Sequence, residues 1–169
     1  MHAGLTAWPI RVLAAACSLV CAVPAAQALV TCTVTAVGVN FGVYDPAMPS
    51  DGTTTGSVTV TCNHVQPGGV EDVTYVLTLS RGSGGTFLPR QLLAGTQPLA
   101  YNLYDSTAGA RVWGDGSSGT VTISGTLRVG PGVGNGTRSR THTIYGIVPA
   151  LQDAPPGNYL DTIVVSLTY

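Results

Sequence analysis

The final stretch of the chain, residues 161–169, constrains the fold most because it alternates strictly between two kinds of side chain. One side of an extended chain would carry Ile163, Val165, Leu167 and Tyr169. The other side would carry mostly hydroxyl side chains, and this period of two is typical of a half-buried β-strand. A final strand needs neighbours on both sides or remains an open sheet edge. We therefore expect an open edge here.

The same alternation recurs along the chain and predicts an all-β fold. Strand-like runs occupy residues 30–36, 58–62, 73–79, 99–104, 111–113, 121–127 and 141–148. Turn-forming glycine and proline separate these runs, and no stretch keeps a helical apolar period for three turns. Residues 38–42 are expected to continue the first strand with a kink, and residues 87–98 to be irregular. About seven strands spaced in this way predict one antiparallel sandwich.

The N-terminal segment has the pattern of an export signal rather than of a folded element. One arginine precedes an apolar run at residues 12–23, which is too short to span a bilayer and leads to Ala-Gln-Ala. Cleavage there would remove residues 1–28 and leave residues 29–169 as a single domain. Lipidation is the weaker alternative, because Val20 precedes Cys21 where a small residue is needed. Export to the periplasm, and from there to the cell surface, is the expectation.

Two cysteines remain once the leader is removed. Cys32 and Cys62 both lie on the apolar side of their predicted strands. In an oxidising compartment they are expected to form a buried disulfide, which typically stabilises a fold by about 2–4 kcal/mol. A pair of free thiols or an intermolecular bridge is the alternative. No spacing of further cysteine or histidine residues supports a metal site.

Charge and histidine placement argue against several classes of function. The region after the leader has six arginines, no lysine and eight acidic residues, a net charge of −2. No basic patch suggests nucleic acid or an anionic membrane surface. His64 and His142 lie in no nucleophile motif and no metal spacing, so we expect no enzyme and no cofactor. A secreted hydrolase is a remote alternative.

Two loop positions are candidate contacts with a ligand. Trp113 is expected in the core, where large aromatic side chains usually lie, although an exposed Trp113 would contact a sugar. Asp115 lies in Gly-Asp-Gly and is explained better by a turn than by calcium binding. If the protein is an adhesin, residues 82–98 and 114–119 are the loops expected to contact a surface or glycan.

Several short motifs follow one another along the chain: Cys32-Thr-Val-Thr, Asn40-Phe-Gly-Val-Tyr-Asp-Pro46, Val58-Thr-Val-Thr-Cys62, Tyr101-Asn-Leu-Tyr104, Val112-Trp-Gly-Asp-Gly116, Tyr145-Gly146 and Pro156-Gly-Asn-Tyr-Leu-Asp-Thr-Ile163. In this order they resemble the spore coat protein U domain family, which includes secreted coat proteins and subunits of archaic chaperone–usher pili. They extend over nearly all of residues 29–169. No single motif is decisive, and the resemblance rests on their order and spacing.

The resemblance implies an incomplete immunoglobulin-like sandwich whose last strand is supplied in trans. A periplasmic chaperone would fill the gap first, and a neighbouring subunit would replace it at the outer-membrane usher, by strand addition to the open sheet. The groove would lie between the first and last strands. Its expected residues are Val30, Val34, Ile163, Val165, Leu167 and Tyr169.

The length of chain before the first strand bears on position in such an assembly. After cleavage, only Leu29-Val-Thr would precede Cys32, which leaves no donor segment. The chain would then accept a strand without donating one. We therefore expect a terminal or tip-proximal pilus subunit, or a coat protein that does not polymerise.

Overall fold

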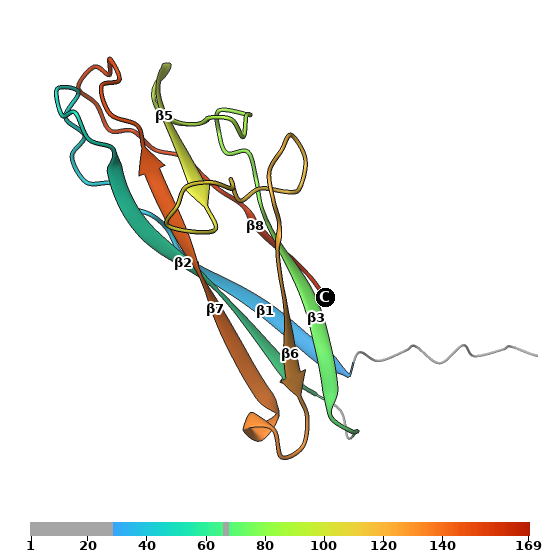
Figure 1. Ribbon diagram of the computed structural model, residues 1–169. Coiled ribbons are helices and arrows are strands. Elements are labelled where there is room, and N and C mark those ends of the chain that lie inside the picture. The colour runs from blue at the N-terminus through green and yellow to red at the C-terminus, as the bar shows by residue number, and fades with distance from the viewer. Residues whose placement is uncertain (1–28, 66–67) are drawn as a thin grey trace, which may run out of the picture.

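The described residues form two antiparallel β-sheets packed face to face (Figure 1). The computed structural model describes residues 29–65 and 68–169, so the expected leader, with Cys17 and Cys21, lies outside them. Within these ranges the only helical element is a 3₁₀ turn, Gly134–Gly136. None of the described helical structure is long and apolar enough to cross a membrane.

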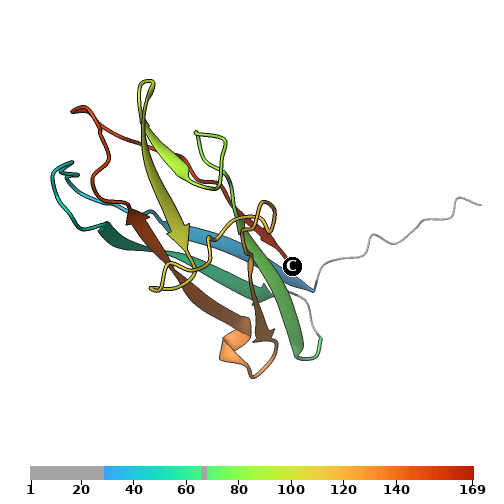
Figure 2. The same ribbon diagram turned by 45° about the horizontal axis from the view of Figure 1, so that its top comes forward.

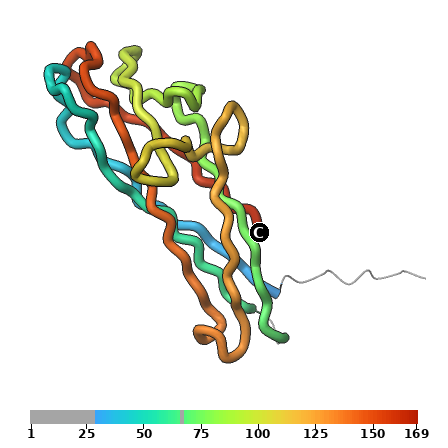
Figure 3. Tube along the Cα trace, viewed as in Figure 1, coloured from blue at the N-terminus to red at the C-terminus, as the bar shows by residue number. Residues whose placement is uncertain are grey.

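The larger sheet has five strands, in the order β1-β2-β7-β5-β4. Their bounds are Val30–Val37 for β1, Gly52–His64 for β2, Thr137–Val148 for β7, Gln97–Tyr104 for β5 and Arg90–Ala94 for β4. The smaller sheet has three strands, β6 (Ile123–Val129), β3 (Glu71–Leu79) and β8 (Val165–Thr168). The tube in Figure 3 shows β2 and β7 running the length of the molecule side by side.

Side-chain alternation assigns one face of each strand to the core and one to solvent. On β2, Val58, Val60 and Cys62 are fully buried. Hydroxyl side chains on the opposite face form cross-strand pairs, with Thr59 Oγ1 lying 2.9 Å from Thr141 Oγ1 on β7. Such pairs stabilise a sheet surface that carries few charges.

The two cysteines are directly opposite one another in the register of β1 and β2. They form a disulfide with an S–S distance of 2.01 Å, and both are buried. The predicted intramolecular bridge is therefore confirmed. It ties the edge strand β1 to the long strand β2.

Trp113 is fully buried, so the expected core packing is confirmed, and the alternative of an exposed Trp113 that contacts a sugar does not apply. Its indole Nε1 donates to the Leu77 carbonyl at 3.3 Å. The strand expected at residues 111–113 is reduced to isolated bridges, Tyr104 with Val112 and Trp113 with Val121. The glycine-rich turn that follows leaves no length for a ladder.

Two further local predictions are wrong. Residues 87–98 were expected to be irregular but contain β4, which brings the number of strands to eight rather than about seven. The pattern concealed β4 because the buried side chain at its start is a charged one, Arg90. Residues 38–42 do not continue the first strand, because β1 ends at Val37.

Candidate binding cleft

Two sheet edges are open on the same side of the sandwich. Among the described residues, β1 pairs only with β2, and β8 pairs only with β3. These two edge strands belong to different sheets, yet they lie close to one another without hydrogen-bonding (Figure 2). Unpaired edges of this kind are templates for another strand.

A mostly apolar cleft of about 1070 Å³ opens on this side of the molecule. One wall comes from residues 36–46, the end of β1 and the segment after it. The other comes from residues 154–165, the segment that leads into β8. Its floor consists of side chains from the sandwich interior. They are Leu79, Leu92, Leu99, Tyr101, Leu103, Ile144 and Val148. The cleft therefore reaches down to the core, although these floor side chains, apart from Leu92, are at most 5% exposed.

The wall that leads into β8 presents alternate side chains to the cleft. Ile163 and Val165 line it and are half-buried, whereas Val164 between them is 59% exposed. The wall backbone is held from behind. The Leu160 amide donates to the Leu93 carbonyl of β4 at 3.0 Å, and the Ser80 amide donates to the Val164 carbonyl at 2.9 Å. The side of this wall that makes no such hydrogen bonds therefore faces the cleft.

Asp161 fixes the same wall to its surroundings. Its carboxylate accepts a 2.5 Å hydrogen bond from the Tyr101 hydroxyl and a 2.6 Å bond from the Ser83 amide. Burial raises the pKa of Tyr101, and the hydrogen bond to Asp161 raises it further. Tyr101 is therefore a neutral donor at physiological pH.

The opposite wall crosses the inner face of the larger sheet at two glycines. A β-carbon on Gly56 would lie 2.6 Å from the Val37 carbonyl oxygen, and one on Gly146 would lie 2.8 Å from the Phe41 ring. Phe41 also packs edge-on against Tyr101, with ring centroids 5.9 Å apart. Glycine at both positions lets the chain lie directly on the sheet.

Tyr44 holds the far end of this wall. Its hydroxyl donates to the Pro149 carbonyl at 3.0 Å and accepts from the Gln152 amide at 2.8 Å. The loop at residues 43–51 thereby lies against the loop that follows β7, at one end of the molecule (Figure 3). Both walls are thus fixed by contacts with the larger sheet and with neighbouring loops.

The six groove residues expected from the sequence are only partly brought together. Ile163 and Val165 line the cleft. Val30 is 7% exposed in the core, and Val34 and Leu167 pack against the core, none of them among the residues that line the cleft. Tyr169 is 55% exposed. The cleft lies beside the C-terminal end of β1 and the N-terminal end of β8, away from Val30, Val34, Leu167 and Tyr169.

Residues 36–46 are the part of the cleft that the sequence reasoning missed. The motif Asn40-Phe-Gly-Val-Tyr contained the signal, because both of its aromatic residues contact the interior. Its lack of alternation led to its interpretation as a kink and a turn. The contact with the sheet depends on Gly56 and Gly146, which are distant in sequence.

Within residues 29–65 and 68–169, no group of three His, Cys, Asp or Glu side chains is placed to hold a metal ion. His142 Nε2 lies 2.7 Å from the Tyr75 hydroxyl between the two sheets. The cleft is suited to apolar side chains and to backbone pairing at its open edges.

The fold and the cleft together define an antiparallel immunoglobulin-like sandwich with an opening along two strand edges. The chain belongs to the family of the Spore Coat Protein U domain, whose model matches residues 16–166. It is 33% identical over 143 residues to Protein U of Myxococcus xanthus, in a match that covers 77% of this chain and 70% of that protein. The resemblance stated from the motifs is therefore confirmed.

A solved structure shares the fold. It is a chain of the CsuC–CsuE chaperone–tip adhesion subunit pre-assembly complex from the archaic chaperone–usher Csu pili of Acinetobacter baumannii. The two superpose with a TM-score of 0.53 at 21% sequence identity, over 83% of this chain. This chain spans 40% of that solved chain, so the likeness concerns one part of it.

Proposed function

We propose that this protein is a non-enzymatic structural subunit of a cell-surface assembly, either an archaic chaperone–usher pilus or a coat, and that it accepts a β-strand in its cleft. The observation that carries the proposal is the apolar cleft between the segment that follows β1 and the segment that leads into β8, next to the open edges of both strands. Family membership and the fold shared with a chain from pilus biogenesis support it.

An incoming strand would pair its backbone with the open edges of β1 and β8. Its alternate side chains would enter the cleft and pack on the floor, which is the chemistry of β-strand addition. Each buried apolar side chain contributes about 1.5–3 kcal/mol, so four or five contribute on the order of 10 kcal/mol. That sum rivals the free energy of unfolding of a typical domain, about 5–15 kcal/mol. The chain alone would therefore be marginally stable.

The partners follow from this mechanism. A periplasmic pilus chaperone would supply the first strand, and a neighbouring pilus or coat subunit would replace it at the outer-membrane usher. The strand would continue beyond the cleft, past Val30 and Val34 on one side and Leu167 and Tyr169 on the other. Ile163 and Val165, which line the cleft, would make the central contacts.

Export and position in the assembly are further parts of the proposal. Removal of residues 1–28 would deliver residues 29–169 to the periplasm and leave no donor segment ahead of β1. The protein would then be terminal or tip-proximal in a pilus. Intact-mass measurement of the exported protein tests this, because a mature N-terminus at Leu29 supports it and retention of an N-terminal extension contradicts it.

A pair of neighbouring variants tests strand acceptance. The probe is a soluble peptide of about ten residues with valine and threonine alternating, the pattern of a half-buried strand. We expect the peptide to raise the melting temperature of the wild-type protein. Ile163→Asp places a carboxylate in the apolar cleft and should weaken binding by at least about thirtyfold, or 2 kcal/mol. Val164→Asp, whose side chain faces away, should bind within about threefold of wild type.

Co-expression with a periplasmic pilus chaperone provides a second readout. Wild type and Val164→Asp should co-purify with the chaperone, and Ile163→Asp should not. A wild-type chain that is monomeric and fully stable alone, and that binds neither peptide nor chaperone, would contradict the proposal.

A further inference from the structure

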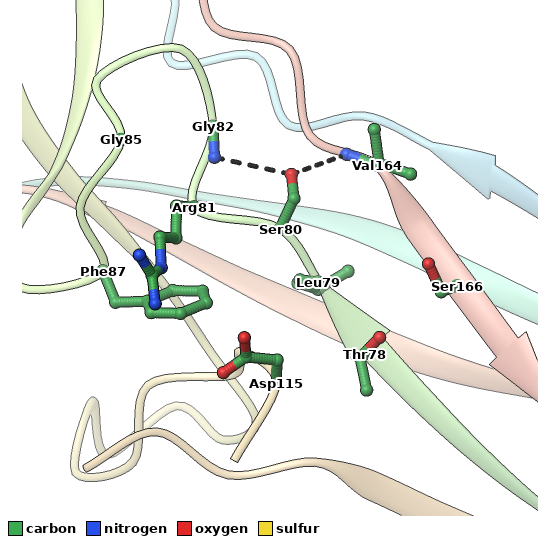
Figure 4. A pocket seen from close by; sticks show the side chains of 10 residues that line it. All are labelled: Thr78, Leu79, Ser80, Arg81, Gly82, Gly85, Phe87, Asp115, Val164 and Ser166. Atoms are coloured by element: carbon green, nitrogen blue, oxygen red, sulfur yellow. Dashed lines mark hydrogen bonds between the residues drawn. The ribbon is translucent and has the colours of Figure 1, made fainter. Parts of the chain in front are cut away.

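A second hollow, of about 580 Å³, lies on the outer face of the smaller sheet. Thr78 of β3 and Ser166 of β8, which are register partners, line its base. Loop residues 80–87 and Asp115 form its rim (Figure 4). The hollow and the cleft lie on opposite sides of the last segment, because Val164 and Ser166 face the hollow while Ile163 and Val165 face the cleft; Leu79 lines both.

Two opposite charges face each other across this hollow without pairing. The Arg81 guanidinium stacks over the Phe87 ring, 5.3 Å from its centroid. The Asp115 carboxylate is held by Ser117, whose amide and hydroxyl both donate to Oδ1, at 2.8 and 2.6 Å. Figure 4 shows the two charged groups pointing toward one another. Within the described residues they form no ion pair.

A buried arginine holds the two loops that carry these charges. Arg90 is fully buried and donates to the Ser80 carbonyl at 3.1 and 2.9 Å and to the Trp113 carbonyl at 2.8 Å. Its guanidinium also lies 5.1 Å from the Phe87 ring centroid. Arg90 therefore fixes the start of the first loop relative to the base of the Asp115 turn. Side chains held by a fixed frame lose little entropy when a ligand binds.

Ser80 joins the same frame to the last strand segment. Its hydroxyl oxygen accepts from the Val164 amide at 2.9 Å and from the Gly82 amide at 3.4 Å (Figure 4). The hollow is thus built from β3, β8 and two loops. Gly82, Gly85, Phe87 and Asp115 lie within residues 82–98 and 114–119, the loops named from the sequence, whereas Ser80 and Arg81 precede them.

The charges and hydroxyl groups select the chemistry of a ligand. Asp115 disfavours an anion and Arg81 disfavours a cation. An apolar ligand would bury both charges without a partner. A neutral molecule rich in hydroxyl groups satisfies both, because one hydroxyl can donate to the carboxylate while its neighbour accepts from the guanidinium. The volume of the hollow falls in the range of small-molecule sites, about 300–1,000 Å³.

We propose that this outer hollow binds a neutral saccharide through Arg81 and Asp115. Thr78 and Ser166 supply further hydroxyl groups at its base, and the stacked Arg81 fixes the position of one sugar edge. The site is open, so the dissociation constant for a monosaccharide is expected to be millimolar, about −4 kcal/mol. Binding here does not require an occupied cleft.

Saturation-transfer NMR on the exported protein tests the proposal with glucose, galactose and mannose, and with glucuronate and glucosamine as charged analogues. At least one neutral hexose should receive magnetisation. Arg81→Gln and Asp115→Asn should each weaken that binding at least about tenfold, because each removes one charge-assisted hydrogen bond. The matched controls Arg128→Gln and Asp153→Asn alter exposed charges elsewhere and should bind as wild type does.

Thermal melts keep the comparison interpretable. The Asp115→Asn variant retains a side-chain oxygen that can accept from Ser117. Among the described residues, the Arg81 side chain makes no hydrogen bond, and Arg81→Gln would remove only its exposed contact with the Phe87 ring, so both variants should melt within a few degrees of wild type. The proposal is overturned if no neutral hexose binds, if the charged analogues bind better, or if the rim variants and the controls bind equally.

Discussion

The hydroxyl of Tyr101 on β5 donates a 2.5 Å hydrogen bond to the carboxylate of Asp161. This bond joins the floor of the cleft to one of its walls. The same carboxylate accepts from the Ser83 amide. One side chain therefore joins the larger sheet, the loop after β3 and the segment that leads into β8. The fold itself therefore sets the position of this wall.

Replacement of Asp161 by alanine should destabilise the protein by about 1–3 kcal/mol, because the Tyr101 hydroxyl and the Ser83 amide lose their acceptor. Urea unfolding followed by tryptophan fluorescence measures the change. Asp153→Ala removes an exposed carboxylate and should stay within about 0.5 kcal/mol of wild type. Equal stability of the two variants would show that the hydrogen bonds to Asp161 contribute nothing to the free energy of unfolding.

Gly146→Ala should displace the Phe41 ring, because the new β-carbon would lie 2.8 Å from it. Overpacking of this kind typically costs about 1–3 kcal/mol. Phe41→Leu in the same chain should recover part of that loss, since the smaller side chain leaves room. Gly69→Ala meets nothing within 4 Å and is the control for thermal melts. A Gly146→Ala protein as stable as this control would contradict the packing.

Replacing both Cys32 and Cys62 by serine should lower the free energy of unfolding by about 2–4 kcal/mol. The bridge joins residues that are 30 positions apart in the chain. Its removal increases the conformational entropy of the unfolded chain, which favours unfolding. Unfolding of wild type with and without reductant provides an independent measurement. Unchanged stability on reduction would contradict the expected contribution.

Stability should fall as the pH decreases below about 6.5 because of His142. Burial lowers the pKa of His142 below its ordinary value of 6.5, and Arg140 lowers it further. The unfolded chain therefore binds the proton more readily, so this contribution is complete above pH 6.5 and is lost as the pH falls through the folded pKa.

His142→Gln removes the titration and retains a hydrogen-bonding group near Tyr75. Its urea midpoint should change less than that of wild type between about pH 7.5 and 5.5. If the His142→Gln variant shows the same change in midpoint as wild type, the pH dependence arises elsewhere.

Much of the fold was predictable because strand faces are a local property of the sequence. Val58, Val60 and Cys62 alternate with threonine, and the structure places them in the core. The disulfide followed from the same alternation, since both cysteines lie on the inward face. β4 escaped prediction because Arg90 is an inward charged residue, and only its contacts with the Ser80 and Trp113 carbonyls explain its burial.

The sequence by itself determined the all-β class, the faces of most strands and the cysteine pair. The tertiary structure decided where the cleft lies, because alternation specifies a face but not a neighbour. That location depends on β1 ending at Val37 and on the chain then crossing Gly56 and Gly146, two residues far apart in the sequence. The outer hollow has the same origin, since only the packing of two loops brings Arg81 and Asp115 to face each other.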